Sequence, residues 1–291
     1  MKLNIEPGTY VVAVSGGVDS VVLLDLLSRR PGLKLIVAHF NHGIRSDSAE
    51  DEKLVKRTAR NYGLKFEATN GQLGVVSEEI ARKARYVFLE AIKAKYQAQA
   101  IITAHHQDDL IETTMINLLR GTGRQGLSSI INNQKIIRPL LNVSKQSILE
   151  YAHQHNLEWQ EDSTNQNPDY LRNYLRLKVL MKLNKKQREI LICNIEKVAK
   201  INNSLDNEFA KLSHNIGQTE IDRQAFSKLP AEVGTEYMAY LLRQCQIKDY
   251  DSTTINRLSL SIKTSKPNTA QPIRQLQSLK LTAATATIAT S

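Results

Sequence analysis

One short run near the N-terminus, Ser15-Gly16-Gly17-Val18-Asp19-Ser20, has the residue types of a phosphate-binding loop. Two glycines let the backbone approach an anion, and a helix that follows directs free N–H groups and its positive dipole end toward it. Ser15 and Ser20 add hydroxyl donors, and Asp19 could hold a Mg²⁺ that bridges phosphates. It is not a Walker A loop, because no Gly-Lys-Ser/Thr follows. The alternative is an ordinary glycine-rich turn with a serine cap.

A second group, His105-His106-Gln107-Asp108-Asp109 with Glu112, stands directly after an apolar run. On a helix, Asp109 and Glu112 are three positions apart and Asp108 and Glu112 four apart, so the carboxylates share one face. Such a face could bind a cationic amine, coordinate Mg²⁺ or accept a proton. A transition-metal site is an alternative, although no separate group of His or Cys ligands is evident. An ordinary surface helix is the other.

Two arginines on a third expected helix, Arg82 and Arg85, are three positions apart. An arginine there could clamp nucleotide phosphates and offset charge that develops in a transition state. A solvated basic face explains either arginine alone equally well. A formal GxGxxG pattern at residues 121–126 follows a helix rather than a strand, so it lacks the context of a dinucleotide site.

A basic stretch lies between Asp169 and Glu189, where seven lysines and arginines outnumber those two acids. Arg172, Arg176 and Lys182 can fall on one helical side, which is typical of a stripe that follows nucleic-acid phosphates. A solvated face is the usual alternative explanation.

The elements that must position these residues alternate between strand and helix patterns, which predicts an α/β fold with a Rossmann-like parallel sheet. Ligands bind at the carboxyl ends of such strands, where the first two groups lie. We expect one domain over 1–184, which carries these groups, and a smaller, mainly helical domain over 185–291 that contacts nucleic acid; residues 281–291 are either a last strand or a frayed tail. The expected strands are 10–14, 33–39, 65–69 and 100–104, and the expected helices are 20–27, 47–62, 77–95, 107–119, 144–155 and 190–212.

Composition narrows the class of protein. The 291 residues include 39 Lys and Arg against 29 Asp and Glu, a net charge of +10, which favours a polyanionic partner, with nucleic acid ahead of a membrane surface; on charge alone, a merely soluble basic protein explains it equally well. The two cysteines, Cys193 and Cys245, form no CxxC, which excludes a disulfide framework, a zinc ribbon and a cysteine-ligated cluster within one chain. No window approaches the roughly 18 apolar residues of a membrane helix, and the first residues lack the apolar core of a signal peptide. We expect a cytoplasmic protein with no membrane partner.

The SGGxDS loop resembles the pyrophosphate loop of the N-type ATP pyrophosphatases. That resemblance implies an adenine-nucleotide α-hydrolase-like fold and cleavage of ATP to AMP and pyrophosphate. In order and spacing, the motifs between about Val11 and Arg176 are similar to those of the tRNA(Ile)-lysidine synthases, whereas the last third resembles that family only loosely, through Ile221-Asp222 and Leu229-Pro230. The further motifs are 39–45 (HFNHGIR), 81–86 (ARKARY), 103–113 (TAHHQDDLIET), 118–123 (LLRGTG), 138–141 (RPLL) and 162–165 (DSTN) with Arg172, Asn173 and Arg176.

This resemblance implies ATP and Mg²⁺, and as partners L-lysine and a tRNA(Ile) with the anticodon CAU; it leaves a homodimer open. It implies that Asp109 and Glu112 hold the lysine beside the nucleotide, with one of them taking the proton from its ε-amine. The implied catalytic residues are Asp19, Arg85, Asp109 and Glu112; the nucleotide is implied at Ser15, Gly16, Gly17, Val18, Asp19, Ser20, His39 and Arg82, the metal at Asp19, and the lysine or tRNA at His105, Asp109, Glu112, Arg172 and Arg176.

Three rival functions stay open from the sequence. A tRNA thiolase of the same fold would generally need cysteine pairs, which the two distant cysteines do not supply. Small-molecule amide-forming ligases would leave the basic second half unexplained. A non-enzymatic, nucleotide-sensing RNA-binding module predicts ATP binding without formation of AMP.

Overall fold

The computed structural model describes residues 3–41, 48–71, 78–132, 135–160, 171–213, 220–247, 250–274 and 277–290. The chain forms two compact units, residues 1–199 and 200–291. The division falls within a long helix, α9 (Lys185–Ser213), and the domain boundary expected near Asn184 lies just before that helix begins. In the described ranges, no helix has both the length and the apolar character needed to cross a membrane.

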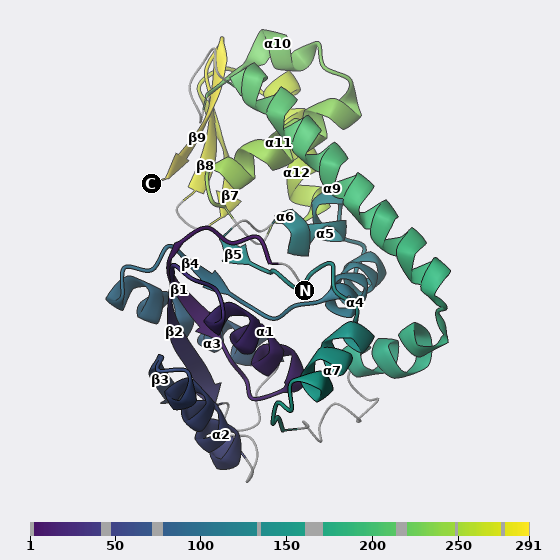
Figure 1. The fold of residues 1–291 in the computed structure, drawn as a ribbon. Coiled ribbons are helices and arrows are strands. Elements are labelled where there is room, and N and C mark those ends of the chain that lie inside the picture. The colour runs from purple at the N-terminus through teal and green to yellow at the C-terminus, as the bar shows by residue number, and fades with distance from the viewer. Residues whose placement is uncertain are drawn as a thin grey trace. The chain divides into compact units, whose positions relative to one another are not determined.

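Unit 1 is built on a five-stranded sheet in the order β3-β2-β1-β4-β5, with every neighbouring pair parallel (Figure 1). This confirms the predicted parallel α/β fold. β5 was not predicted, since two residues are too few to show a strand pattern. The strands are β1 (Gly8–Ala13), β2 (Leu33–Asn41), β3 (Lys65–Asn70), β4 (Ala100–Ile102) and β5 (Ile136–Ile137).

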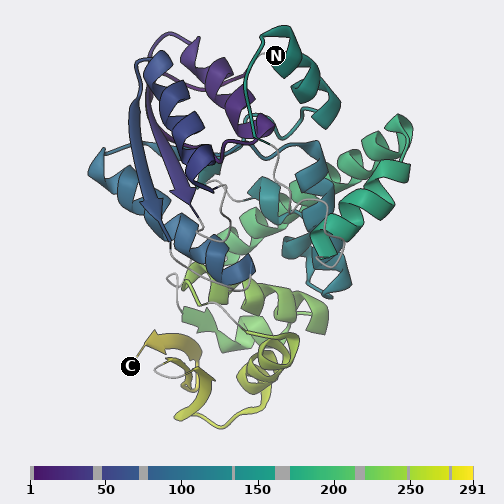
Figure 2. The ribbon, with the colours of Figure 1, turned by 90° about the horizontal axis from the view of Figure 1, so that it is seen from below.

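Helices cover both faces of this sheet, which explains the continuous apolar run of its central strand. Val11 and Val12 of β1 are fully buried on opposite faces. Val12 packs in the cluster with α1, α2 and α7, and Val11 in the cluster with α3; Figure 2 shows α1 and α2 on one side of the sheet and α3 on the other. These helices are α1 (Val18–Ser28), α2 (Ser48–Asn61), α3 (Glu78–Lys95) and α7 (Lys145–Gln154).

A second helical layer of unit 1 packs around α4 (Gln107–Leu119), whose bounds match the prediction. Leu110 and Ile111 of α4 share a buried cluster with Leu180 and with Ile192 of α9. Gly121, in the left-handed region at φ +67°, ends α4, and the discounted GxGxxG pattern runs from this turn into the short helix α5 (Arg124–Leu127). The other elements are α5 (Arg124–Leu127), α6 (Ser129–Asn132), α8 (Leu171–Tyr174), a π-helical turn (Leu175–Val179) and a 3₁₀ turn (Leu180–Lys182).

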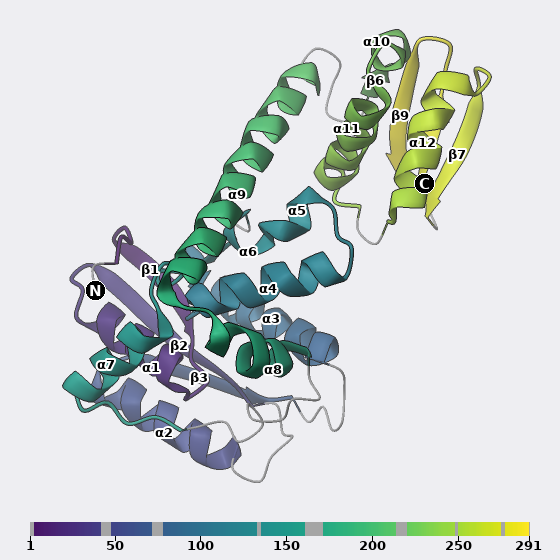
Figure 3. The ribbon, with the colours of Figure 1, turned by 90° about the vertical axis from the view of Figure 1, so that its right-hand side faces the viewer.

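Unit 2 contains helices, as expected of a mainly helical domain, and also a four-stranded antiparallel sheet, in the order β6-β9-β8-β7, that was not anticipated (Figure 3). Its core joins Phe226, Met238, Leu258 and Leu279 from both kinds of element. The last residues form a strand, the first of the two alternatives left open for them. The elements are β6 (Glu220–Asp222), α10 (Arg223–Ser227), α11 (Ala231–Gln244), α12 (Ser252–Thr264), β7 (Thr269–Arg274), β8 (Gln277–Leu281) and β9 (Thr285–Thr290).

Candidate active site

The predicted phosphate loop connects β1 to α1, and Ser20 holds its shape. The Ser20 hydroxyl accepts hydrogen bonds from the N–H groups of Ser15 and Gly16, both at 3.2 Å, and donates to the carbonyl of Gly17 at 2.8 Å. Gly16 lies at φ +98°, a conformation that side chains disfavour. Gly17 precedes α1 without a side-chain cap, so the first turn of that helix is suited to receive an anion.

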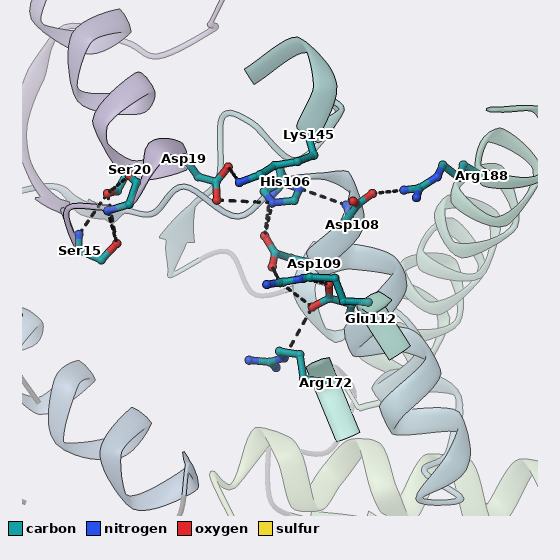
Figure 4. Close-up of polar contacts among 12 residues, drawn as sticks. Ser15, Asp19, Ser20, His106, Asp108, Asp109, Glu112, Lys145, Arg172 and Arg188 are labelled. Atoms are coloured by element: carbon teal, nitrogen blue, oxygen red, sulfur yellow. Dashed lines mark hydrogen bonds and ion pairs between the residues drawn. The ribbon is translucent and has the colours of Figure 1, made fainter. Parts of the chain in front are cut away.

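Asp19, in the first turn of α1, joins this loop to two other elements (Figure 4). Its Oδ1 lies 2.6 Å from Nζ of Lys145, and its Oδ2 lies 3.7 Å from Nε2 of His106. Lys145 begins α7, where Ser144 accepts a hydrogen bond from the N–H of Ser147 as the N-cap. Lys145 was not predicted as a site residue, because no local pattern connects it with Asp19, 126 positions earlier.

His106 caps α4 and faces both Asp19 and Asp109. Its Nδ1 accepts a hydrogen bond from the N–H of Asp108 at 3.2 Å, while Asp109 accepts one from the N–H of His106 at 2.9 Å, which completes a capping box. Because Nδ1 accepts, the ring proton is placed on Nε2. That atom lies 3.7 Å from Asp19 and 3.6 Å from Asp109, so one buried side chain spans the space between the loop and the acidic helix.

The expected acidic pair, Asp109 and Glu112, is brought together, and arginines contact both members. Arg176 donates to Glu112 from Nε at 2.8 Å and from NH2 at 3.1 Å, and it lies 3.6 Å from Asp109. Arg172 lies 3.8 Å from Glu112. The guanidiniums therefore occupy the positions that a substrate amine would take beside these carboxylates.

The two carboxyls of the pair differ in acidity. Glu112 has no exposed surface, and burial raises its pKa despite the nearby Arg176. Burial also acts to raise the pKa of Asp109, but His106 and His105, the hydrogen bond from the His106 N–H and the charge of Arg176 together outweigh it, and the net shift is downward. At a given pH, Glu112 is thus the better proton acceptor of the two.

In the basic stretch after residue 169, the arginines and the lysines have different surroundings. Its arginines contact acids of α4: Arg172 and Arg176 meet Glu112, and Arg188 donates a hydrogen bond to Asp108. Its lysines are exposed, namely Lys178, Lys182, Lys185 and Lys186. The contacts described for the two predicted tRNA-binding arginines are therefore with carboxylates, and contact with tRNA stays a prediction for the whole stretch.

Arg82 and Arg85 both lie over the ring of Tyr86, at 5.1 and 5.4 Å from its centroid. Burial lowers the pKa of the Arg85 guanidinium. His105 accompanies this group: burial, with the positive charge of Arg138 and neighbouring arginines, lowers its pKa to about 4, so its imidazole is neutral at neutral pH. The charge of this cluster is therefore carried by its arginines, and His105 is neutral beside them.

His39 is buried at the end of β2, where its Nδ1 lies 2.8 Å from the carbonyl oxygen of Val14. Val14 directly precedes the phosphate loop, so the contact described for His39 supports the entry of that loop. The rest of its motif, residues 42–45, and the predicted motif at 162–165 lie outside the described residues.

The donor set at Asp19 bears on the metal. Over the described ranges, no cluster of three or more His, Cys, Asp or Glu side chains is arranged to hold a metal ion, which gives the transition-metal alternative no support. A nucleotide-bound Mg²⁺ needs less, because it takes most of its ligands from phosphates and water and one or two from carboxylates. Asp19, partly exposed beside the phosphate loop, fits that requirement.

A comparison with protein families identifies the domain. The PP-loop domain family matches residues 3–183. The chain belongs to the PP-loop family. Membership implies the use of ATP, in agreement with the prediction from the loop.

Several curated relatives carry one name, tRNA(Ile)-lysidine synthase. That of Hydrogenovibrio crunogenus is 40% identical over 192 residues, which cover 61% of this chain and 45% of that protein. That of Thermotoga maritima is 38% identical over 188 residues, 60% of this chain and 45% of that one. That of Nitrosomonas europaea is 30% identical over 289 residues, 92% and 62% of the two chains. These matches confirm the resemblance drawn from the motifs, and this chain spans about half the length of the first relatives.

One solved structure has the same fold. The U34-tRNA thiolase of Methanococcus maripaludis superposes with a TM-score of 0.55 at 16% identity, over 67% of this chain and 74% of that one. At this identity the likeness concerns the fold alone.

Proposed function

We propose that the protein is a tRNA(Ile)-lysidine synthase, a carbon–nitrogen ligase that joins L-lysine to the wobble cytidine of a tRNA(Ile) with the anticodon CAU. The observation that carries the proposal is the position of His106, which faces Asp19 of the phosphate loop at 3.7 Å and Asp109 of the acidic helix at 3.6 Å. The side chain of His106 therefore separates the phosphate loop from the acidic face that we propose binds the amine. The relatives that carry this name supply independent support.

The proposed reaction has two steps. The C2 carbonyl oxygen of the cytidine attacks the α-phosphorus of ATP, and pyrophosphate leaves. The neutral ε-amine of lysine then forms a bond to C2, and the C2–O bond breaks as AMP leaves. The carbonyl oxygen is a poor leaving group until it becomes a phosphate ester, so the first step makes the second feasible. The base must be unstacked to enter the site, which a single-stranded anticodon loop permits.

The nucleotide side of the site follows from the loop geometry. The turn at 15–17 and the start of α1 would bind phosphates, with Arg82 and Arg85 offsetting the charge that develops on them. His39, through its contact with the carbonyl oxygen of Val14, would hold the start of the loop in place. When bound at Asp19, Mg²⁺ would shield the phosphate charge. The neutral His105 would border the substrate side without adding to the positive charge there.

On the acceptor side, Asp109 and Glu112 would hold the lysine ammonium, and Glu112, whose pKa burial raises, would take its proton. An incoming ammonium has to compete with Arg176 for the oxygens of Glu112. The exposed lysines of 178–186 would meet tRNA phosphates, whereas Arg172 and Arg176 would reach tRNA only after leaving their carboxylates. Action on tRNA would place the protein in the cytoplasm.

The rivals find less support. Of the two cysteines, Cys193 is exposed on α9 and Cys245 follows α11, and neither belongs to a CxxC motif. A thiolase mechanism with a cysteine-ligated cluster would therefore lack its ligands within one chain.

The deciding experiment measures AMP release from ATP with lysine and a CAU-anticodon tRNA(Ile) each supplied or withheld. We expect release to require both. Release that depends on tRNA but not on lysine would keep the adenylation step and assign another nucleophile. Absence of release in every combination would favour the binding module.

Asp19→Ala supplies a matched test of the loop. We expect it to abolish AMP release while tRNA binding stays largely intact, because Asp19 lies at the phosphates and not on the exposed basic stretch. Glu90→Ala, which removes a half-exposed carboxylate of α3, is the control and should retain activity. Unchanged turnover in Asp19→Ala would remove the loop from the mechanism.

A further inference from the structure

The phosphate loop has no lysine of its own, yet an ammonium group lies at its helix. Lys145 Nζ is 2.6 Å from Asp19 Oδ1, in the first turn of α1 (Figure 4). We propose that Lys145 is a phosphate-binding residue of the active site: it binds the β- and γ-phosphates of ATP and stabilises pyrophosphate as it leaves. The phosphate contact stands on the geometry, whereas the identity of the reaction and the assignment of Lys145 to the β- and γ-phosphates rest on the proposed function.

Lys145 is held by a rigid pair of helices. α1 and α7 run in register, since Asp19 meets Lys145 and Asp25 meets Tyr151 with the same separation of 126 positions. The Tyr151 hydroxyl donates to the buried Asp25 at 2.7 Å, and Ile148 of α7 is buried in the same cluster as the leucines of α1. The backbone of Lys145 is thus fixed relative to the loop, and only its flexible stem needs to move.

The charges at Asp19 explain why Lys145 would move. Lys145 lies at Oδ1 of Asp19, so a Mg²⁺ that took this oxygen would displace the ammonium. Nucleotide phosphates bring new acceptors to the start of α1. Lys145 would then exchange a carboxylate oxygen for a phosphate oxygen, and both charges of the original pair would stay compensated. Both side chains are about one-third exposed, so neither is locked in the pair.

The two oxygens of Asp19 indicate which phosphates Lys145 reaches. Oδ2 faces His106 and the acidic helix, and Oδ1 faces Lys145. The α-phosphorus has to lie on the side of the acidic helix, where the amine arrives. The β- and γ-phosphates, which leave as pyrophosphate, would therefore lie on the side of Lys145.

The experiment measures binding of two probes by calorimetry: inorganic pyrophosphate with Mg²⁺, and AMP. We expect Lys145→Met, which keeps most of the stem, to weaken pyrophosphate binding roughly ten- to a hundredfold, the worth of a hydrogen bond to a charged group, and to leave AMP binding unchanged. Lys145→Arg keeps the charge and should retain pyrophosphate binding, which controls for misfolding. Lys95→Met is the matched control, because Lys95 makes a 2.6 Å ion pair with Glu67 outside the site.

Two results would overturn the assignment. Unchanged pyrophosphate affinity in Lys145→Met would mean that Lys145 only neutralises Asp19. Equal loss of AMP and pyrophosphate binding would mean that it shapes the pocket as a whole. Failure of the proposed function is separable: a wild-type protein that binds pyrophosphate through Lys145 but releases no AMP with lysine and tRNA keeps this assignment and loses the ligase reaction.

Discussion

In unit 1, the pKa values of two buried carboxylates are shifted in opposite directions, although both residues lie on helices, have no exposed surface and face an arginine. Asp25 accepts two hydrogen bonds from Arg29, at 2.8 and 2.9 Å, and one each from the hydroxyls of Tyr62 and Tyr151, at 2.6 and 2.7 Å. Burial acts to raise the pKa of Asp25, but these four donors outweigh it and the pKa falls. Burial prevails at Glu112, whose pKa rises.

The difference lies in the number and permanence of the donors. Asp25 has its hydrogen-bonding capacity filled by three side chains from α1, α7 and the end of α2, which fixes these elements together. Glu112 accepts two hydrogen bonds from Arg176, which is one-third exposed; Arg172 is farther away, at 3.8 Å, and Asp109 is a like charge nearby. A filled carboxylate serves the fold, whereas an incompletely compensated one is available to bind a cation or accept a proton.

The largest expected effect comes from Glu112→Gln. We expect AMP release in the presence of tRNA and lysine to fall roughly 10²- to 10⁴-fold, the usual contribution of a general base. Single-turnover assays with Glu90→Gln as control would measure it. A rate within twofold of wild type would show that Glu112, like Asp25, is a structural carboxylate.

Asp25→Asn should affect stability instead. Removing one partner of a buried charged network costs about 3–5 kcal/mol, so we expect the free energy of unfolding in urea to fall by that amount. A loss below about 1 kcal/mol would contradict the view that Asp25 holds α1, α2 and α7 together.

Tyr151→Phe tests one donor of that network. Loss of a hydrogen bond to a charged acceptor should lower the unfolding free energy by about 1.5–3 kcal/mol. Tyr10→Phe is the matched control: its hydroxyl donates at 3.0 Å to the neutral backbone carbonyl of Glu6, and its removal should cost about 0.5–1.5 kcal/mol. Equal losses would mean that the charge of Asp25 adds nothing.

The smallest effect, and the sharpest contrast, is in the pH dependence of stability. The lowered pKa of Asp25 gives stability that is present above the unfolded pKa near 3.9 and is lost as pH falls, so the deficit of Asp25→Asn should grow as pH rises from acid to neutral. The raised pKa of Glu112 gives stability that is present below the unfolded pKa near 4.3 and is lost as pH rises. Glu112→Gln should therefore gain relative to wild type as the pH rises above about 4.3. Urea titrations from about pH 2 to about pH 7.5 would cover both intervals, and slopes of the same sign would break the comparison.

The features that could be predicted from the sequence are those that depend on residues close together in the chain. The end of α4 follows from the Arg120-Gly121 after it, and the loop at 15–20 follows from its glycines and its position after an apolar strand. These signals arise from neighbours in the chain, so they survive without knowledge of the fold.

Contacts between distant residues could not be predicted in this way. Lys145 meets Asp19 and Tyr151 meets Asp25 across 126 positions, and Arg188 meets Asp108 across 80. Charge counting identified the basic stretch but could not separate arginines that face acids from lysines that face solvent. The short, threonine-containing strands of unit 2 gave too weak a pattern to predict its sheet.

The π-helical turn at Leu175–Val179 has a consequence for insertions and deletions. Such a turn accommodates one residue more than an α-helical turn. Deleting one residue here would restore the ordinary α-helical pitch and leave the segments on either side in nearly the same phase, because the wider turn uses its extra residue for about the same rotation. If the deleted residue were Leu175, the net charge would not change, and Arg172 and Arg176 would be three positions apart on one side of an ordinary helix. The turn thus allows the loss of one residue with both arginines kept on the side of Glu112.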